Sequence, residues 1–161
     1  MEKEKCLQIP VPGNKELCLR HLVLDYNGTL AVDGELIAGV MERLAGLADR
    51  LWIHIVTADT FGSVLSMFAG SGYDLFILPE GNQTEAKRKF VESLGPDSCV
   101  CIGNGRNDEL MLKSAALGVV VIQEEGAAVA TLLAADIAAP TILRALDLLE
   151  HPLRLVATLR S

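Results

Sequence analysis

The chain has few aromatic side chains, little basic charge and no long apolar run, and these shortages exclude several classes of protein. Phe, Trp and Tyr make up 4% of its 161 residues, and 14 Lys and Arg face 21 Asp and Glu, for a net charge of -7. A nucleic-acid-binding protein needs a basic excess to contact phosphates. A membrane span needs ~18 uninterrupted apolar residues, and a secretion signal needs an apolar stretch after its charged start. We therefore expect no nucleic-acid partner, no membrane insertion and a cytoplasmic location.

Cysteine is also sparse, and its four positions are Cys6, Cys18, Cys99 and Cys101. The last two alternate within an apolar run, so both side chains face one side of a strand. A structural zinc site would need a second pair of ligands beside this CxC pair. We interpret the cysteines as small buried apolar residues in a reducing compartment.

Leu, Val, Ala and Ile supply most of the apolar content, and half of all residues are hydrophobic. A chain of this length suits one domain that buries roughly two thirds of its unfolded surface. Buried parallel strands flanked by Ala-rich helices have this composition. We predict one α/β domain over residues 1–161, with a peripheral strand and hairpin at 1–16, a core at 17–150 and a C-terminal tail at 151–161.

Apolar runs alternate along the chain with stretches of helical periodicity. The predicted strands are Leu17 to Leu24, Leu51 to Val56, Leu75 to Leu78, Cys99 to Ile102 and Val119 to Ile122. The predicted helices are Leu36 to Arg50, Thr60 to Ser71, Thr84 to Leu94, Asp108 to Ala116, Ala127 to Ala135 and Thr141 to Leu149. Cys6 to Val11 should form an edge strand with a turn at Pro12 to Asn14. The alternation predicts a three-layer, Rossmann-like sheet of mostly parallel strands with helices on both faces, without a large cap domain.

Polar residues directly follow three of the predicted strands. They are Asp25 to Thr29, Thr57 to Asp59 and Gly103 to Asp108. Parallel α/β sheets bind ligands at the carboxyl ends of their strands, and glycines there let the backbone approach a ligand closely. Two carboxylates and a hydroxyl should therefore meet at one edge of the sheet. We assign no role to Asp59 or Arg106.

The order and spacing of these residues resemble the haloacid dehalogenase-like (HAD) superfamily. That superfamily carries DxDGT after its first strand, Thr or Ser after the second, a later Lys, and GDGxND. The likeness covers nearly the whole chain, and it implies that Asp25 is the nucleophile, Thr57 a phosphate donor, Lys87 a charge stabiliser and Asp108 a Mg²⁺ ligand. The segment Gly103 to Leu112 also resembles P-type ATPases, so the chain looks like their soluble, membrane-free relatives.

The resemblance implies a Mg²⁺-dependent phosphohydrolase or phosphoryl-accepting enzyme that forms an aspartyl-phosphate at Asp25. The implied metal ligands are Asp25, Asn27, Asn104 and Asp108. The implied phosphate-binding residues are Asp25, Gly28, Thr57, Ala58 and Lys87. The partner would be a phosphorylated substrate, a small molecule or a macromolecule, and a homo-oligomer is also compatible with the apolar helices.

Two substitutions depart from the family pattern. Asn27 stands where the phosphatases carry the second Asp, their general acid and base, and its amide cannot exchange a proton in that role. Loss of this catalysis slows a reaction by roughly 10²–10⁴-fold. P-type ATPases also lack that Asp, having Thr in DKTGT. Asn104 replaces the first Asp of GDGxND and removes charge from the implied metal site. An alternative function therefore stays open: a catalytically weakened module that binds phosphate and Mg²⁺ and regulates or scaffolds a partner.

Each candidate residue also has a purely structural interpretation. Turn and cap roles suit Asp25, Thr57, Asn104, Asn107 and Asp108. Lys87 can be one of three consecutive solvated charges. The histidines show no pairing or ligand spacing, so we expect no catalytic role for His21, His54 or His151.

Overall fold

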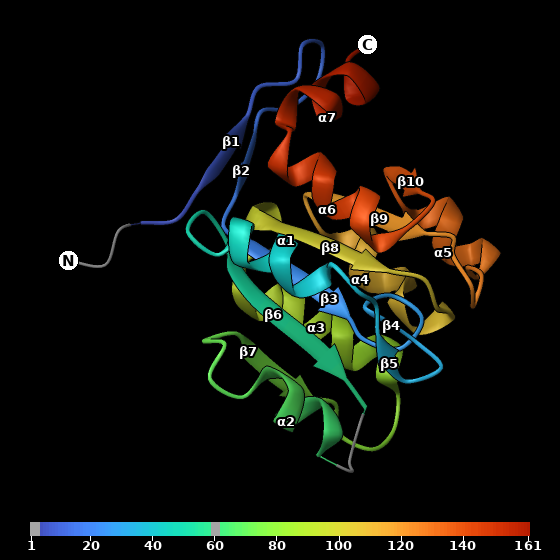
Figure 1. Cartoon of the computed structure of the whole chain (residues 1–161). Coiled ribbons are helices and arrows are strands. Elements are labelled where there is room, and N and C mark those ends of the chain that lie inside the picture. The colour runs from blue at the N-terminus through green and yellow to red at the C-terminus, as the bar shows by residue number, and fades with distance from the viewer. Residues whose placement is uncertain (1–3, 59–61) are drawn as a thin grey trace.

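Six parallel strands form the central sheet, in the order β10-β9-β8-β3-β6-β7 (Figure 1). The computed structural model describes residues 4–58 and 62–161. The strands of this sheet are β3 (His21–Asp25), β6 (Trp52–Thr57), β7 (Asp74–Ile77), β8 (Cys99–Gly103), β9 (Leu117–Val121) and β10 (Ile137–Ala139). The predicted α/β sheet is confirmed. Asp59 and the predicted helix start at Thr60 lie outside the described residues.

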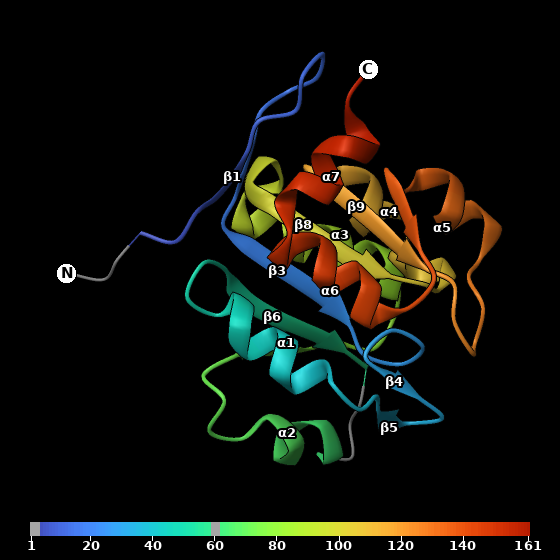
Figure 2. The same ribbon diagram turned by 45° about the horizontal axis from the view of Figure 1, so that its top comes forward.

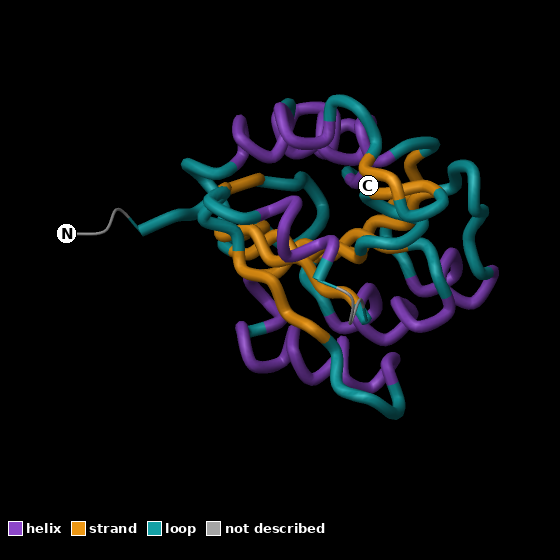
Figure 3. The backbone as a smooth tube through the Cα atoms, turned by 60° about the horizontal axis from the view of Figure 1, so that its bottom comes forward, coloured by secondary structure: helices purple, strands orange, loops and turns teal. Residues whose placement is uncertain are grey.

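Helices cover both faces of the sheet and make three layers (Figures 2 and 3). One face packs against α1 (Val40–Leu47), α2 (Ser63–Phe68), α6 (Ile142–Glu150) and α7 (Pro152–Leu159). The other packs against α3 (Gln83–Leu94) and α4 (Glu109–Ser114), with α5 (Val129–Ala134) beside α4. Central strands are buried on both faces, which explains their continuous apolar runs. Among the helices described here, none has the length and apolar character needed to cross a bilayer.

An antiparallel hairpin, β1 (Leu7–Ile9) and β2 (Leu17–Leu19), projects from the sheet near the C-terminus (Figure 1). The predicted strand Leu17 to Leu24 was therefore wrong in extent, and the sheet begins at His21 instead of Leu17. Arg20 marks the change of partner, because its N–H donates to the Ser98 carbonyl at 2.8 Å. Apolar residues continue through this change, so the sequence pattern does not reveal where pairing switches.

A disulfide joins Cys6 to Cys18 across this hairpin, with a Cα–Cα distance of 5.9 Å. The interpretation of all four cysteines as reduced buried residues was therefore wrong for this pair. Antiparallel pairing brings the two together, and that register is not visible in their spacing. Cys99 and Cys101 are free and buried, as predicted.

Three further segments differ from the predictions. A short hairpin, β4 (Ala31–Val32) and β5 (Glu35–Leu36), takes the first residues of the predicted helix at Leu36, and α1 begins after Gly39, whose φ is 92°. Strand β10 was missed because it has only three residues. The segment 151–161, expected as a tail, forms α7 and buries Leu155 against the core. Two short 3₁₀ turns flank β8: η1 (Pro96–Ser98) precedes it and η2 (Arg106–Asp108) follows it.

Candidate active site

Asp25 is the last residue of β3 and is 7% exposed. The chain turns at once after it, because the Tyr26 carbonyl accepts hydrogen bonds from the N–H groups of Leu30 and Ala31. Gly28 in this turn has φ 79°, and a Cβ at that position would collide with the side chain of Asn104. Only glycine combines this left-handed backbone with such close approach.

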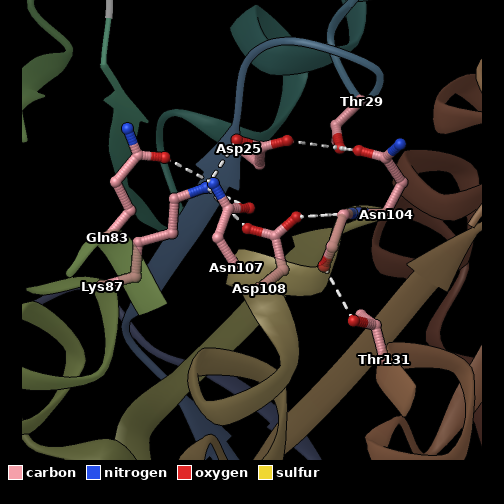
Figure 4. A network of polar contacts seen from close by, with 9 residues as sticks. Asp25, Thr29, Gln83, Lys87, Asn104, Asn107, Asp108 and Thr131 are labelled. Carbon is pink, nitrogen blue, oxygen red and sulfur yellow. Dashed lines mark hydrogen bonds and ion pairs between the residues drawn. The ribbon is translucent and has the colours of Figure 1, made fainter. Parts of the chain in front are cut away.

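Lys87 connects the two carboxylates that the sequence singled out (Figure 4). It projects from α3, is 1% exposed, and its Nζ lies 2.7 Å from Asp25 Oδ1 and 2.7 Å from Asp108 Oδ1. Burial by itself lowers the pKa of the Lys87 ammonium, but the carboxylates of Asp25 and Asp108 outweigh burial and hold it above its ordinary value. Lys87 is therefore a fixed cation at this position.

Burial, followed by the neighbouring Asp108 carboxylate, raises the pKa of Asp25 to about 7, against the opposing effect of Lys87. One ammonium balances only one of two buried carboxylates. With Asp25 ionised, the site therefore carries an excess of negative charge, and another cation in contact with Asp25 would favour this ionised form.

Asp108 is fully buried between η2 and α4. Its Oδ2 accepts hydrogen bonds of 2.9 Å from the N–H groups of Asn104 and Gly105, which are the first residues after β8. The turn that ends β8 thus holds the Asp108 carboxylate toward Lys87. Asp108 stands at the N-cap position of α4, but its side chain makes no capping hydrogen bond to that helix. Its carboxylate is bonded instead to the turn before it and paired with Lys87.

Thr29 links Asp25 to Asn104. Its hydroxyl lies 3.2 Å from Asp25 Oδ2 and 3.2 Å from Asn104 Oδ1. The Asn104 orientation is set by its Nδ2, which donates to the Gly126 carbonyl at 3.0 Å. A hydroxyl has one hydrogen to donate, so it cannot serve both acceptor oxygens at once. Either Asp25 Oδ2 or Asn104 Oδ1 therefore receives no hydrogen from Thr29.

These oxygens suit a Mg²⁺ ion. The described residues contain no group of three or more His, Cys, Asp or Glu side chains placed to hold a metal. Mg²⁺ does not need such a cage, because it commonly binds one or two carboxylates together with waters and a substrate phosphate. Asp25 and Asp108 supply the carboxylates, and the amide oxygen of Asn104 is a further hard donor. The donor set therefore fits the ion that the resemblance implies.

A cavity of ≈ 250 Å³ opens beside Asp25 at the carboxyl edge of the sheet. Its lining residues are Asp25, Asn27, Thr57, Ala58, Leu78, Gln83, Lys87, Asn104, Gly105, Asn107 and Glu125. Most residues predicted for the site are thus brought together, including Thr57 at the end of β6. Of the predicted set, Gly28 and Asp108 are not part of this lining. Asn27 is exposed at the cavity, so its side chain is open to solvent.

Residues that the sequence reasoning did not assign also hold the site together. Gln123, after β9, donates its Nε2 to the carbonyls of Gly28 at 3.0 Å and Thr29 at 2.7 Å, and its Oε1 accepts from the Ile142 N–H at 2.9 Å. Thr29 could have been found, because it belongs to the DxDGT pattern. Gln123 belongs to no motif of the resemblance, and its partners are backbone groups.

Asn107 does more than form a turn. Its Oδ1 lies 3.4 Å from Lys87 Nζ, and its Nδ2 donates to Gln83 Oε1 at 2.9 Å (Figure 4). Gln83, at the first turn of α3, was also missed. The two amides place polar groups around the ammonium on the cavity side.

Two of the three histidines are paired, although their spacing in the sequence shows no pairing. His21 Nδ1 lies 3.0 Å from His54 Nε2, and His54 Nδ1 lies 3.1 Å from Asp74 Oδ2. Parallel pairing of β3, β6 and β7 brings them together, which their spacing in the chain does not indicate. His21 is the first residue of β3 and His54 lies in the first half of β6, and neither lines the cavity.

No family model matches the chain. Two proteins of Methanocaldococcus jannaschii are similar in sequence. "Uncharacterized protein MJ0073" is 46% identical over 85 residues, which is 50% of this chain and 91% of the relative. The chain belongs to the same family as MJ0073. "Uncharacterized protein MJ0072" is 51% identical over 39 residues, 24% of this chain and 89% of that protein.

Solved structures identify the fold. A Legionella pneumophila protein described within the HAD superfamily (subfamily III A) hydrolases superposes with TM-score 0.70 at 18% identity, covering 88% of this chain and 87% of that one. The 3-deoxy-D-manno-octulosonate 8-phosphate phosphatase of Moraxella catarrhalis was solved with magnesium, phosphate and KDO. It superposes with TM-score 0.64 at 16% sequence identity, covering 88% of this chain and 94% of that one. The cobalt-bound Haemophilus influenzae phosphatase YrbI superposes with TM-score 0.68 at 15% sequence identity, covering 83% of this chain and 88% of that one. This member of the MJ0073 family thus has the HAD fold.

Proposed function

We propose that the protein is a Mg²⁺-dependent phosphohydrolase in which Asp25 accepts the phosphoryl group. The observation that carries the proposal is the contact of one buried ammonium, Lys87, with both Asp25 and Asp108 beside an open cavity. An anionic phosphoryl group repels an unassisted carboxylate, so positive charge must be in place before attack. Phosphatases with the same fold bind magnesium, cobalt and phosphate, which supports this choice of chemistry.

In this proposal, the residues around the cavity have the following roles. Lys87 favours the ionised form of Asp25 and aligns its carboxylate, so that an Asp25 oxygen attacks phosphorus while the bond to the leaving oxygen breaks. The Thr57 hydroxyl and the Ala58 N–H donate hydrogen bonds to the oxygens of the transferred group. Gln123 holds the Gly28–Thr29 backbone in register with the cavity. Asp25, Asp108, the Asn27 carbonyl and Asn104 would hold a Mg²⁺ ion, which would neutralise charge on the phosphate.

The open cavity favours a phosphorylated substrate whose remainder stays in solvent. Among HAD proteins, we place the chain with the soluble relatives of P-type ATPases, because of the Gly103 to Leu112 segment and the absence of an Asp at position 27. This assignment concerns the phosphorylation chemistry alone. The segment between Asp25 and Lys87 contains 61 residues and carries no nucleotide-binding domain of the kind that the pumps insert there.

The test is hydrolysis of acetyl phosphate and of an aryl phosphate, with and without Mg²⁺, by wild type and by Asp25→Asn. Wild type should release phosphate only with Mg²⁺ and should carry an acid-stable phosphoryl label. Asp25→Asn keeps the size of the side chain and removes the nucleophile, so it should lose both. A labelled Asp25→Asn protein, or Mg²⁺-independent turnover, would refute the assignment.

A second candidate function is a phosphate- and Mg²⁺-binding module that regulates a partner. Two observations favour it: Asn27 cannot transfer protons, and the Asn104 amide is bonded to Gly126. Such a module binds phosphate without turnover. Asp at positions 27 and 104 separates the candidates. A module that is inactive only because it carries the two asparagines should gain hydrolysis when both are replaced by Asp.

A further inference from the structure

The hydrolysis of an aspartyl-phosphate needs a group that takes a proton from the attacking water. Asn27 cannot do this, and Lys87 is engaged as an ammonium by two carboxylates. Among the described residues that line the cavity, Asp25 and Glu125 are the carboxylates. Asp25 is consumed as the nucleophile, which leaves Glu125.

The backbone around Glu125 is held at several points. The Gly126 N–H donates to the Gln123 carbonyl at 2.8 Å and closes a turn with Glu124 and Glu125 at its centre. On one side of the turn, the Gln123 side chain donates to the carbonyls of Gly28 and Thr29, in the loop that follows Asp25. On the other, the Gly126 carbonyl accepts from Asn104. These hydrogen bonds hold the backbone of the turn that carries Glu125 against the Gly28–Thr29 segment that follows Asp25.

The side chain of Glu125 is also positioned. Its Oε2 accepts a hydrogen bond of 3.3 Å from the N–H of Asp33, at the tip of the β4–β5 hairpin. A carboxylate has a second oxygen, so Oε1 can accept a hydrogen bond from a water in the cavity. Both acids of the turn are exposed, but Glu125 lines the cavity and Glu124 does not.

We propose that Glu125 is the general base that hydrolyses the phosphoenzyme. The inference rests on the proposed function, because it needs an aspartyl-phosphate at Asp25. The water oxygen attacks phosphorus, and the phosphorus–oxygen bond to Asp25 breaks with its electron pair returning to the Asp25 carboxylate. The water proton passes to Glu125, which later releases it to solvent. Glu125 thus does for the second step what an Asp at position 27 does in the family pattern.

The test compares Glu125→Gln with Glu124→Gln, which removes the adjacent charge outside the cavity. Glutamine keeps an oxygen for the Asp33 N–H but accepts no proton from water, so the fold and the hairpin contact should survive. Protein is labelled with acetyl phosphate and Mg²⁺, unreacted acetyl phosphate is removed, and loss of label is followed. We expect Glu125→Gln to label normally and to lose its label roughly 100-fold more slowly than wild type. Glu124→Gln should lose its label at the wild-type rate.

A third variant combines Glu125→Gln with Asn27→Asp, which places a carboxylate at the family position. It should recover part of the lost rate, whereas a fold damaged by Glu125→Gln would not recover. Equal decay in Glu125→Gln and wild type, or equal slowing in Glu124→Gln, would overturn the role of Glu125 while leaving the proposed function intact. Absence of label and of turnover in folded wild type would overturn both.

Discussion

Replacing Lys87 by Met tests the electrostatic centre of the site. The substitution leaves two buried carboxylates, Asp25 and Asp108, without the ammonium that lies 2.7 Å from each. Removing one partner of a buried ion pair costs about 3–5 kcal/mol. We expect Lys87→Met to lower the free energy of unfolding by about 4 kcal/mol at pH 8, measured by urea denaturation without Mg²⁺ or phosphate.

The loss should depend on pH with a defined sign. Burial and Asp108 raise the pKa of Asp25 to about 7 even with Lys87 present. Removing the cation raises it further. A carboxyl whose folded pKa lies above its unfolded value binds more protons when folded, so its contribution to stability is present at low pH and is lost as pH rises through the folded pKa. The deficit of Lys87→Met should therefore shrink to about 2 kcal/mol at pH 5, where Asp25 is protonated in both proteins.

Two variants complete the measurement. Lys89→Met removes an exposed ammonium from the same helix and should change stability by less than about 0.5 kcal/mol. Adding Asp108→Asn to Lys87→Met removes one of the unpaired charges and should recover more than about 1 kcal/mol. A deficit for Lys87→Met below about 1 kcal/mol at pH 8, or one equal at both pH values, would refute the reasoning.

Other changes have distinct expected outcomes. Asn104→Asp loses the hydrogen bond to the Gly126 carbonyl and adds a negative charge, so this variant should be about 1–3 kcal/mol less stable than wild type without Mg²⁺. Mg²⁺ should reduce the difference in melting temperature between the variant and wild type. An unchanged difference would argue against metal binding at this position. Burial lowers the pKa of His54 to about 4, so its contribution to stability is present above pH 6.5 and lost as pH falls toward 4. The free energy of unfolding of wild type relative to His54→Gln should fall by about 2–3 kcal/mol over that range, because Asp25 titrates alike in both proteins and its contribution cancels. The exposed control His151→Gln should follow wild type. Reducing the Cys6–Cys18 disulfide, which spans 12 residues, should cost about 2–3 kcal/mol by urea denaturation, and a double Ser variant should not respond to reductant.

The sequence alone locates the strand-end residues of the site for a simple reason. Parallel strands of one sheet end at the same edge, so Asp25, Thr57 and Asp108 must lie near one another once the strands are recognised. Lys87 is different, because it stands on a helix among three consecutive basic residues. Only the family resemblance separated it from Arg88 and Lys89, and the packing of α3 on the sheet explains why it is the buried one.

The contacts that escaped the sequence reasoning depend on backbone partners or on register. Gln123 binds carbonyl groups, and every residue has one, so no pattern of side chains points to it. Cys6 and Cys18 meet because β1 pairs antiparallel with β2 in one particular register. Strand β10 has three residues and too little apolar sequence to stand out from the helices around it.

The two asparagines change the charge of the site in a consistent direction. Asp25, Asp108 and Lys87 sum to -1, whereas Asp at positions 27 and 104 would bring the sum to -3. At about 5 Å and an effective dielectric constant of 20, each added carboxylate repels one unit of phosphate charge by about 3 kcal/mol. Under the proposed function, the present site would therefore admit a phosphate at lower electrostatic cost and would attract Mg²⁺ less strongly. Hydrogen bonds of Asn104 and Gln123 join the Gly28–Thr29 segment, Asn104 and the turn that carries Glu125. Glu125 thus places a carboxylate at the cavity without adding charge at the proposed metal ligands.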